Sequence, residues 1–178
     1  NEVINGIPDW VNEEEFGFNR ALTFNGDGTM LCWIRYDEKA VRQYDLQLFK
    51  GSHPERKEYA VYPGLYSYKY PKAGEANSKV TAWSYDIKSH RTQQLNVPVD
   101  ADGYMPRIIG TSDADRIVVY TMNRHQDVLN LYTVNPRSTV ARLLIKESVP
   151  KYVQEDAMAN IRIGSDYVLL PSDRDGFM

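Results

Sequence analysis

Short runs of β-branched and aromatic residues, separated by polar turns, constrain the fold of this 178-residue chain more than any other feature. The clearest group lies at 107–111, 116–122, 129–134 and 141–146. Four strands in about forty residues are typical of one blade of a β-propeller. The pattern therefore predicts an all-β fold made of antiparallel, four-stranded blades.

Similar strands are expected on both sides of this group. The turn at 25–28 contains Asp-Gly between apolar runs at 20–25 and 30–36, which is a strong hairpin signal. A third strand at 41–49 would continue the same antiparallel meander. The remaining expected strands are 79–86, 91–97, 160–164 and 166–170. The sequence ends just after an Asp-Gly pair, where an edge would be left unpaired, so we expect an incomplete last blade.

Together these elements predict a fragment of one β-propeller domain, with about three to four blades. An acidic segment, helical or irregular, would occupy 1–19, and a blade would occupy 20–78, with residues 50–77 as an extended excursion from the sheet. Further blade strands would fill 79–150, followed by the incomplete blade at 151–178.

The acidic segment contains three consecutive carboxylates, Glu13, Glu14 and Glu15, set between Trp10 and Phe16. If both aromatic neighbours are buried, the backbone between them is fixed and the carboxylates keep a defined direction. Adjacent carboxylates repel one another, so an arriving ammonium group relieves the repulsion and gains charge-assisted hydrogen bonds. The α-amine of a peptide is one such cation. The alternative is a solvated first helical turn, where the helix dipole favours acidic residues in any case.

Composition argues against several classes of function. The net charge is only −3, and no cluster of Lys and Arg has the density of a nucleic-acid-binding patch. The single cysteine, Cys32, lies in an apolar run and is interpreted as a small buried hydrophobe rather than a nucleophile. No apolar run approaches the roughly 20 residues that span a bilayer. We expect any export signal to lie upstream of this chain.

Catalytic and metal-binding motifs are also missing from the sequence. There is no Gly-x-Ser-x-Gly motif, and His53, His90 and His125 all fall in expected turns or loops, so neither a serine triad nor a zinc site is supported. The Asp-rich turns at 100–103 and 173–176 lack the full ligand series of a calcium loop. We therefore expect no cofactor and no metal.

Five motifs stand in a distinctive order along the chain. They are Asn5-Gly-Ile-Pro-Asp-Trp-Val-Asn-Glu-Glu-Glu-Phe16, Phe24-Asn-Gly-Asp-Gly-Thr-Met-Leu31, Tyr70-Pro-Lys-Ala-Gly-Glu-Ala-Asn77, Met122-Asn-Arg-His-Gln-Asp-Val-Leu129 and Ser172-Asp-Arg-Asp-Gly-Phe177. The ordered set resembles the dipeptidyl peptidase IV family, serine exopeptidases of the prolyl oligopeptidase clan. Two positions depart from the family pattern: Asn12 replaces a Tyr, and Ser78 replaces a Pro.

The resemblance implies an eight-bladed propeller that caps an α/β-hydrolase domain. In that family the last two carboxylates of the triplet hold the N-terminal ammonium of the substrate, a role that falls here on Glu14 and Glu15. Glu13 and Asn12 would support them. The catalytic Ser, Asp and His would lie in the hydrolase domain, outside this chain, so the segment alone is expected to bind and not to hydrolyse.

The resemblance also implies a homodimer. The family's arm helps to build the dimer, and the resemblance places that arm here at about 42–70. The candidate contact residues are Tyr44, Leu46, Leu48, Tyr59 and Tyr62. The alternative for this segment is a variable surface loop without a partner.

The expected function is substrate docking in an exported enzyme, periplasmic or attached to the cell envelope, that removes N-terminal X-Pro or X-Ala dipeptides from peptides with a free N-terminus. A propeller that serves only as a protein-interaction scaffold, with the triplet as surface charge, is the alternative. The two hypotheses differ in whether a hydrolase sequence follows this segment in the gene.

Overall fold

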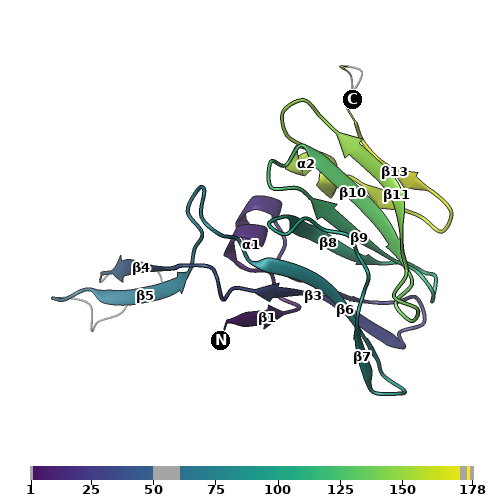
Figure 1. Cartoon of the computed structure of the whole chain (residues 1–178), viewed down its shortest axis with the longest axis horizontal. Coiled ribbons are helices and arrows are strands. Elements are labelled where there is room, and N and C mark those ends of the chain that lie inside the picture. Colours follow the sequence, from purple (N-terminus) through teal and green to yellow (C-terminus); the bar gives the residue numbers. More distant parts are fainter. Residues whose placement is uncertain (1, 50–60, 173–175, 177–178) are drawn as a thin grey trace.

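The computed structural model describes residues 2–49, 61–172 and 176. Two antiparallel sheets lie side by side, and a two-stranded arm extends away from them (Figure 1). The elements in chain order are β1 (Val3–Asn5), α1 (Trp10–Phe16), β2 (Leu22–Phe24), β3 (Met30–Asp37), β4 (Gln43–Leu48), β5 (Gly64–Lys69), β6 (Lys79–Asp86), β7 (Arg91–Gln94), β8 (Tyr104–Gly110), β9 (Ile117–Met122), β10 (Val128–Val134), β11 (Ala141–Ser148), α2 (Glu155–Ala159), β12 (Arg162–Ile163) and β13 (Val168–Leu169). The expected all-β, partial propeller architecture is confirmed.

The first sheet has an interrupted edge strand. Its order is β1-β3-β6-β7, and β2 also pairs with β3. β1 lies opposite 35–37 and β2 lies opposite 31–33, so the two short strands occupy successive parts of one edge of β3. Between them the amide of Ala21 donates to the carbonyl of Gly6 at 2.9 Å. The residues between Gly6 and Ala21, including α1, are therefore an excursion from a single edge strand.

The second sheet is a regular four-stranded meander in the order β11-β10-β9-β8. Its four strands correspond to the group that the sequence pattern predicted at 107–146. Every residue of β9 is buried, because this strand has protein on both faces. That environment explains its continuous apolar run, in place of the alternation seen in β3, whose burial alternates residue by residue.

Two apolar cores lie on the two faces of the second sheet. One joins it to the first sheet through Met30, Cys32, Ile34, Ile117 and Val119, among others. The other packs its opposite face against α1 and the segment around α2, through Val11, Phe16, Val118, Tyr120 and Met158, among others. Neither core could form from one blade alone, so each sheet depends on its neighbour for burial.

At the junction between the two sheets, their backbones approach closely, and ion pairs join the sheets at the edge of the junction. A Cβ added at Gly110 would clash with the carbonyl oxygen of Phe24 on β2. At the rim, the Arg137 guanidinium lies 3.2 Å from the Asp27 carboxylate and 3.7 Å from that of Asp86. Arg137 lies in the turn between β10 and β11 of the second sheet, Asp27 lies in the turn between β2 and β3, and Asp86 ends β6, so this arginine ties the two blades together.

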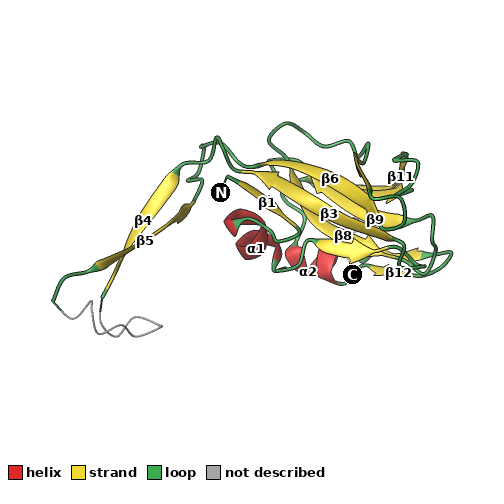
Figure 2. Cartoon of the chain, turned by 90° about the horizontal axis from the view of Figure 1, so that it is seen from below, coloured by secondary structure: helices red, strands yellow, loops and turns green. Residues whose placement is uncertain are grey.

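The arm corrects one expectation from sequence. The strand expected at 41–49 does not continue the meander: β4 pairs with β5, and the two form a separate sheet (Figure 2). The free edge of β3 is taken by β6 instead. β4 is mostly exposed, whereas β6 alternates buried and half-buried residues and packs in the blade.

One boundary expected from sequence is changed by this pairing. β6 and β7 complete the first blade, so that blade ends at Gln94 rather than at residue 78. The last described elements, β12 and β13, form a two-stranded sheet that follows α2. Tyr59 and most of the turn at 173–176 lie outside the described residues.

We expect Gly110→Ala to lower the free energy of unfolding by about 1–3 kcal/mol, because the new Cβ meets backbone that cannot move without separating the blades. Urea denaturation would measure the change. Gly28→Asn is the matched control: a Cβ at Gly28 meets nothing within 4 Å, and Asn tolerates the left-handed conformation found there (φ +70°). Equal effects of the two substitutions would contradict the blade-junction argument.

Candidate functional site

Helix α1 is seven residues long and is capped at both ends. At its start, the Asp9 side chain accepts a hydrogen bond from the amide of Asn12 at 2.9 Å. At its end, Gly17 adopts the left-handed conformation and its amide donates to the carbonyl of Glu13 at 3.0 Å. Since so short a helix is unstable in isolation, its geometry depends on these caps and on packing.

The packing of α1 turns its three glutamates outward. Phe16 is 1% exposed and meets the ring of Tyr104 edge-on, with the ring centroids 5.3 Å apart. Trp10, at the other end, is half-buried and lies 4.3 Å from the ring of Tyr70. The aromatic anchors expected from sequence are therefore present, and Glu13, Glu14 and Glu15 are all exposed.

Asn12 lies behind the acidic turn, where it is 2% exposed. Its side-chain amide donates to the Asp9 carboxylate at 2.7 Å, which gives that carboxylate a second bond from the same residue. Its Oδ1 is buried and has no hydrogen-bond partner among the described residues. Asn12 thus holds the capping carboxylate in place rather than facing a ligand.

An aromatic cluster joins α1 to the base of the arm. We define the aromatic cluster as Trp10, Tyr44, Tyr66, Tyr68 and Tyr70, whose neighbouring ring centroids lie 4.3–6.3 Å apart. Partial burial raises the pKa of Tyr68, and the nearby tyrosine hydroxyls and the Glu14 carboxylate raise it further. The Glu14 charge therefore acts on this cluster.

A groove of about 780 Å³ opens between α1, β1 and the arm. We call it the helix–arm groove, and its charged lining residues are Glu2, Asp9, Glu13, Glu38 and Lys69. Trp10, Tyr66 and Tyr68 line the same groove. An acidic and aromatic lining favours a cation as the occupant.

Glu38 is the residue of this groove that sequence reasoning missed. It is 6% exposed, although the sequence suggested an open turn after the strand at 30–36. Burial raises the pKa of its carboxyl, and the Asp9 carboxylate raises it further, while the Lys69 ammonium acts in the opposite direction. No local pattern signals this burial, because the groove that Glu38 lines is formed by α1, β1 and the arm together.

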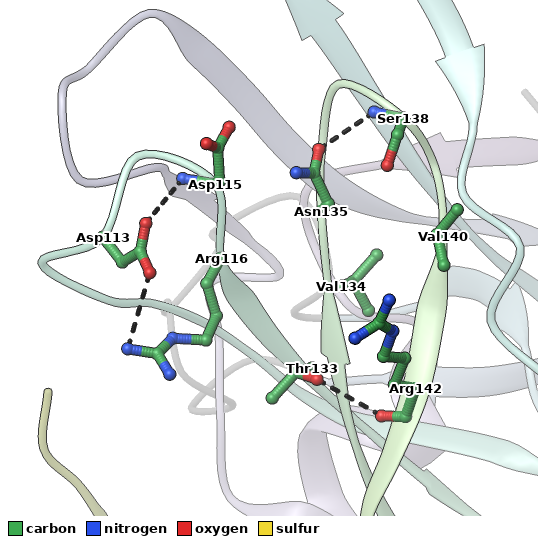
Figure 3. A pocket seen from close by; sticks show the side chains of 9 residues that line it. All are labelled: Asp113, Asp115, Arg116, Thr133, Val134, Asn135, Ser138, Val140 and Arg142. Atoms are coloured by element: carbon green, nitrogen blue, oxygen red, sulfur yellow. Dashed lines mark hydrogen bonds and ion pairs between the residues drawn. The ribbon is translucent and has the colours of Figure 1, made fainter. Parts of the chain in front are cut away.

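A second hollow, of about 360 Å³, lies between the turn after β8 and the turn after β10 (Figure 3). Its charges balance within the protein: Asp113 pairs with Arg116 at 3.6 Å, and Asp115 lies 3.8 Å from Arg137. It opens at the end of the second sheet opposite to α1, since Ile117 lies at this end and Met122 at the other. This hollow is separate from the acidic triplet.

Other reactive groups in the described part of the chain have structural roles. Cys32 is fully buried, and burial raises the pKa of its thiol to about 12, which confirms the interpretation as a core residue. His90 and His125 lie in turns, as expected, whereas His53 lies outside the described residues. Within residues 2–49, 61–172 and 176, no group of three or more metal-ligating side chains is present, and no helix is long and apolar enough to cross a membrane.

Comparison with known proteins agrees with this architecture. A family described as the dipeptidyl peptidase IV N-terminal region matches residues 1–178. The chain belongs to this family. The crystal structure of Porphyromonas gingivalis dipeptidyl peptidase 4 superposes with a TM-score of 0.83 at 38% identity, over 93% of this chain and 22% of that one.

Curated relatives agree with the assignment. Dipeptidyl-aminopeptidase B of Aspergillus niger is 31% identical over 156 residues, which are 83% of this chain and 17% of the relative. A protein named "Probable dipeptidyl-aminopeptidase B" from Emericella nidulans is 34% identical over 152 residues, which are 80% of this chain and 16% of the relative. The chain thus spans about a sixth of the length of these relatives.

The burial of Glu38 predicts a pH-dependent effect of Glu38→Gln. The pKa of the Glu38 carboxyl is higher in the folded protein than in the unfolded chain, where it is near 4.3. The protonated carboxyl therefore contributes its full stability below the unfolded pKa, and that contribution is lost as the pH rises through the folded pKa. Glu38→Gln should therefore increase the free energy of unfolding at pH 7 relative to the unmodified protein, and much less at pH 4. Urea denaturation at the two pH values would measure it.

Glu75→Gln is the matched control, because Glu75 is exposed and pairs with Arg42 at 3.5 Å on the surface. An exposed pair contributes about 0–1 kcal/mol, so this variant should differ little from the unmodified protein at either pH. For each pH, the free energy of unfolding of Glu38→Gln is compared with that of the unmodified protein. A smaller gain at pH 7 than at pH 4 would contradict the prediction.

Proposed function

We propose that this chain is the substrate-docking segment of a longer serine exopeptidase that removes N-terminal dipeptides. The observation that carries the proposal is the outward acidic face of α1, a helix capped at both ends and anchored in the core by Phe16. Membership of the dipeptidyl peptidase IV N-terminal region family supports the reaction class.

Glu14 and Glu15 bind the α-ammonium group of the peptide in this proposal. The caps hold the helix backbone before substrate arrives, so little conformational entropy is lost on binding. An ammonium carries three N–H donors and can be shared by two carboxylates. Glu13 and Asn12 support the pair: Glu13 adds negative charge, and Asn12 restrains the Asp9 cap.

The docked ammonium would set the register of the peptide. With its N-terminus held at a fixed distance from the nucleophile, only the second peptide bond reaches the reacting position. Binding energy at one end of the substrate is thereby used for orientation at the other. We assign the hydrolytic step to an α/β-hydrolase domain outside this chain, and the preference for Pro or Ala at the second position to that domain.

We also propose that the parent enzyme is exported and forms a homodimer through the arm. Tyr62 is 79% exposed, and Leu46 and Tyr44 are each more than a third exposed, whereas Leu48 is half-buried. Such an exposed apolar surface suits a contact between proteins. Sedimentation of the intact protein, with and without the tip of the arm, would test this; an unchanged mass would contradict it.

The scaffold hypothesis makes a different prediction. A propeller that only binds other proteins needs no amine selectivity, so loss of the triplet would affect free and N-acetylated peptides equally. Reading the gene downstream of this segment also separates the hypotheses, because a Gly-x-Ser-x-Gly motif followed by Asp and His is expected only for the enzyme.

In the full-length enzyme, Glu14→Gln or Glu15→Gln should reduce kcat/KM for a dipeptide substrate with a free amine. Losing one carboxylate of a desolvated ion pair costs about 2–5 kcal/mol, or roughly 30- to 5,000-fold in kcat/KM. Steady-state kinetics with a chromogenic dipeptide amide would measure the loss.

Asp113→Asn is the matched control, since it also removes a carboxylate but lies in the hollow at the opposite end of the second sheet (Figure 3). It should leave kcat/KM within about twofold, the effect of a surface ion pair. Unchanged kinetics in both glutamate variants would reject the docking role.

A further inference from the structure

The helix–arm groove contains a buried carboxylate that nothing in the described protein neutralises by contact. Glu38 is 6% exposed and lines the groove. Among the described residues, its carboxylate makes no hydrogen bond and no ion pair. Because an isolated buried charge is costly, native proteins usually pair it, so an unpaired one marks a place where a partner is expected.

Lys69, the cation that lines the groove together with Glu38, is engaged elsewhere. The Lys69 ammonium donates to the carbonyl of Val41 at 2.9 Å and lies 3.9 Å from the Glu2 carboxylate. It lowers the pKa of Glu38 only from a distance. Asp9, which also lines the groove, adds a second buried carboxylate at 5% exposure. The groove therefore carries more negative than positive charge: Glu2, Asp9, Glu13 and Glu38 against Lys69.

The arrangement favours an organic cation over a metal ion. Within the described residues no three carboxylates approach closely enough to ligate one ion. The negative charges are instead spread along a groove whose walls include Trp10, Tyr66 and Tyr68. A guanidinium group fits such a surface, because it is flat, stacks on aromatic rings and presents five N–H donors to separate acceptors.

We propose that the helix–arm groove binds the guanidinium group of an arginine side chain, with the Glu38 carboxylate as its principal acceptor. Tyr66 and Tyr68 supply the stacking surface, and Glu13, at the mouth of the groove, adds a second carboxylate. The site is distinct from the ammonium site proposed at Glu14 and Glu15, although both use α1. One helix would then present two cation sites that select different groups of a peptide.

The direct test uses Nα-acetyl-arginine amide, which carries a guanidinium but no α-ammonium group, so it cannot report on the Glu14 and Glu15 site. Binding to the intact protein would be measured by ligand-observed NMR titration. The uncharged analogue Nα-acetyl-citrulline amide is the matched ligand control. We expect saturable binding of the arginine compound and none of the citrulline compound at the same concentration.

Variants connect the binding to the groove. Glu38→Gln should weaken binding about tenfold or more, the loss of one charge-assisted hydrogen bond. It removes a buried charge that has no contact partner among the described residues, so it should not prevent folding. Tyr66→Leu, at a residue 56% exposed, should weaken binding a few-fold through lost stacking without disturbing the core. Glu75→Gln, an exposed glutamate at the base of the arm, should leave binding unchanged.

Three results would overturn the proposal: no binding to the intact protein, equal binding of the citrulline analogue, or binding that survives Glu38→Gln. The arginine-site proposal can be tested independently of the docking function proposed for Glu14 and Glu15. Glu14→Gln should reduce kcat/KM yet leave Nα-acetyl-arginine amide binding unchanged, whereas Glu38→Gln should weaken that binding.

Discussion

The interrupted edge strand of the first blade is the constraint on which the rest of the structure depends. β1 and β2 pair with successive parts of β3, and the Ala21 amide closes the gap by donating to Gly6. Backbone hydrogen bonds along this edge stay nearly complete, so the blade tolerates an excursion between the two strands. The two ends of the excursion are held together, which gives α1 a fixed origin on a rigid sheet.

From that origin, α1 is positioned by two different kinds of contact. Phe16 inserts into the core against the second blade, and Trp10 packs on the tyrosines at the base of the arm. The helix therefore links three parts of the molecule that are far apart in sequence: the first blade, the second blade and the arm. The acidic residues on its exposed side gain direction from these contacts and not from the helix itself, which is too short to be stable alone.

The carboxylates around α1 show how location gives the same chemical group different properties. Asp9 is buried and satisfied as a helix cap, Glu13 to Glu15 are exposed, and Glu38 is buried without a contact partner in the described structure. The first is structural, since two donors from Asn12 satisfy it. The exposed glutamates are available to a ligand at little desolvation cost. Glu38 carries the highest cost, because burial and Asp9 both disfavour its charge.

The sequence alone determined the strand pattern, the family and the acidic motif, because these depend on residues that are neighbours in the chain. Asp-Gly turns, alternating burial in β3 and the continuous apolar run of β9 all leave local signals. The tertiary structure decided which strands pair. β4 and β6 both follow β3 in the chain, and β6, with its alternating buried residues, took the edge of the blade, while β4 paired with β5 in the arm.

The burial of Glu38 was likewise decided in three dimensions, since the groove is built from α1, β1 and the arm, and no local pattern encodes their meeting. The side-chain pattern thus determined the secondary structure and the kind of blade. The site was determined by which strand pairs with the edge of β3, and by the packing of α1 against the arm.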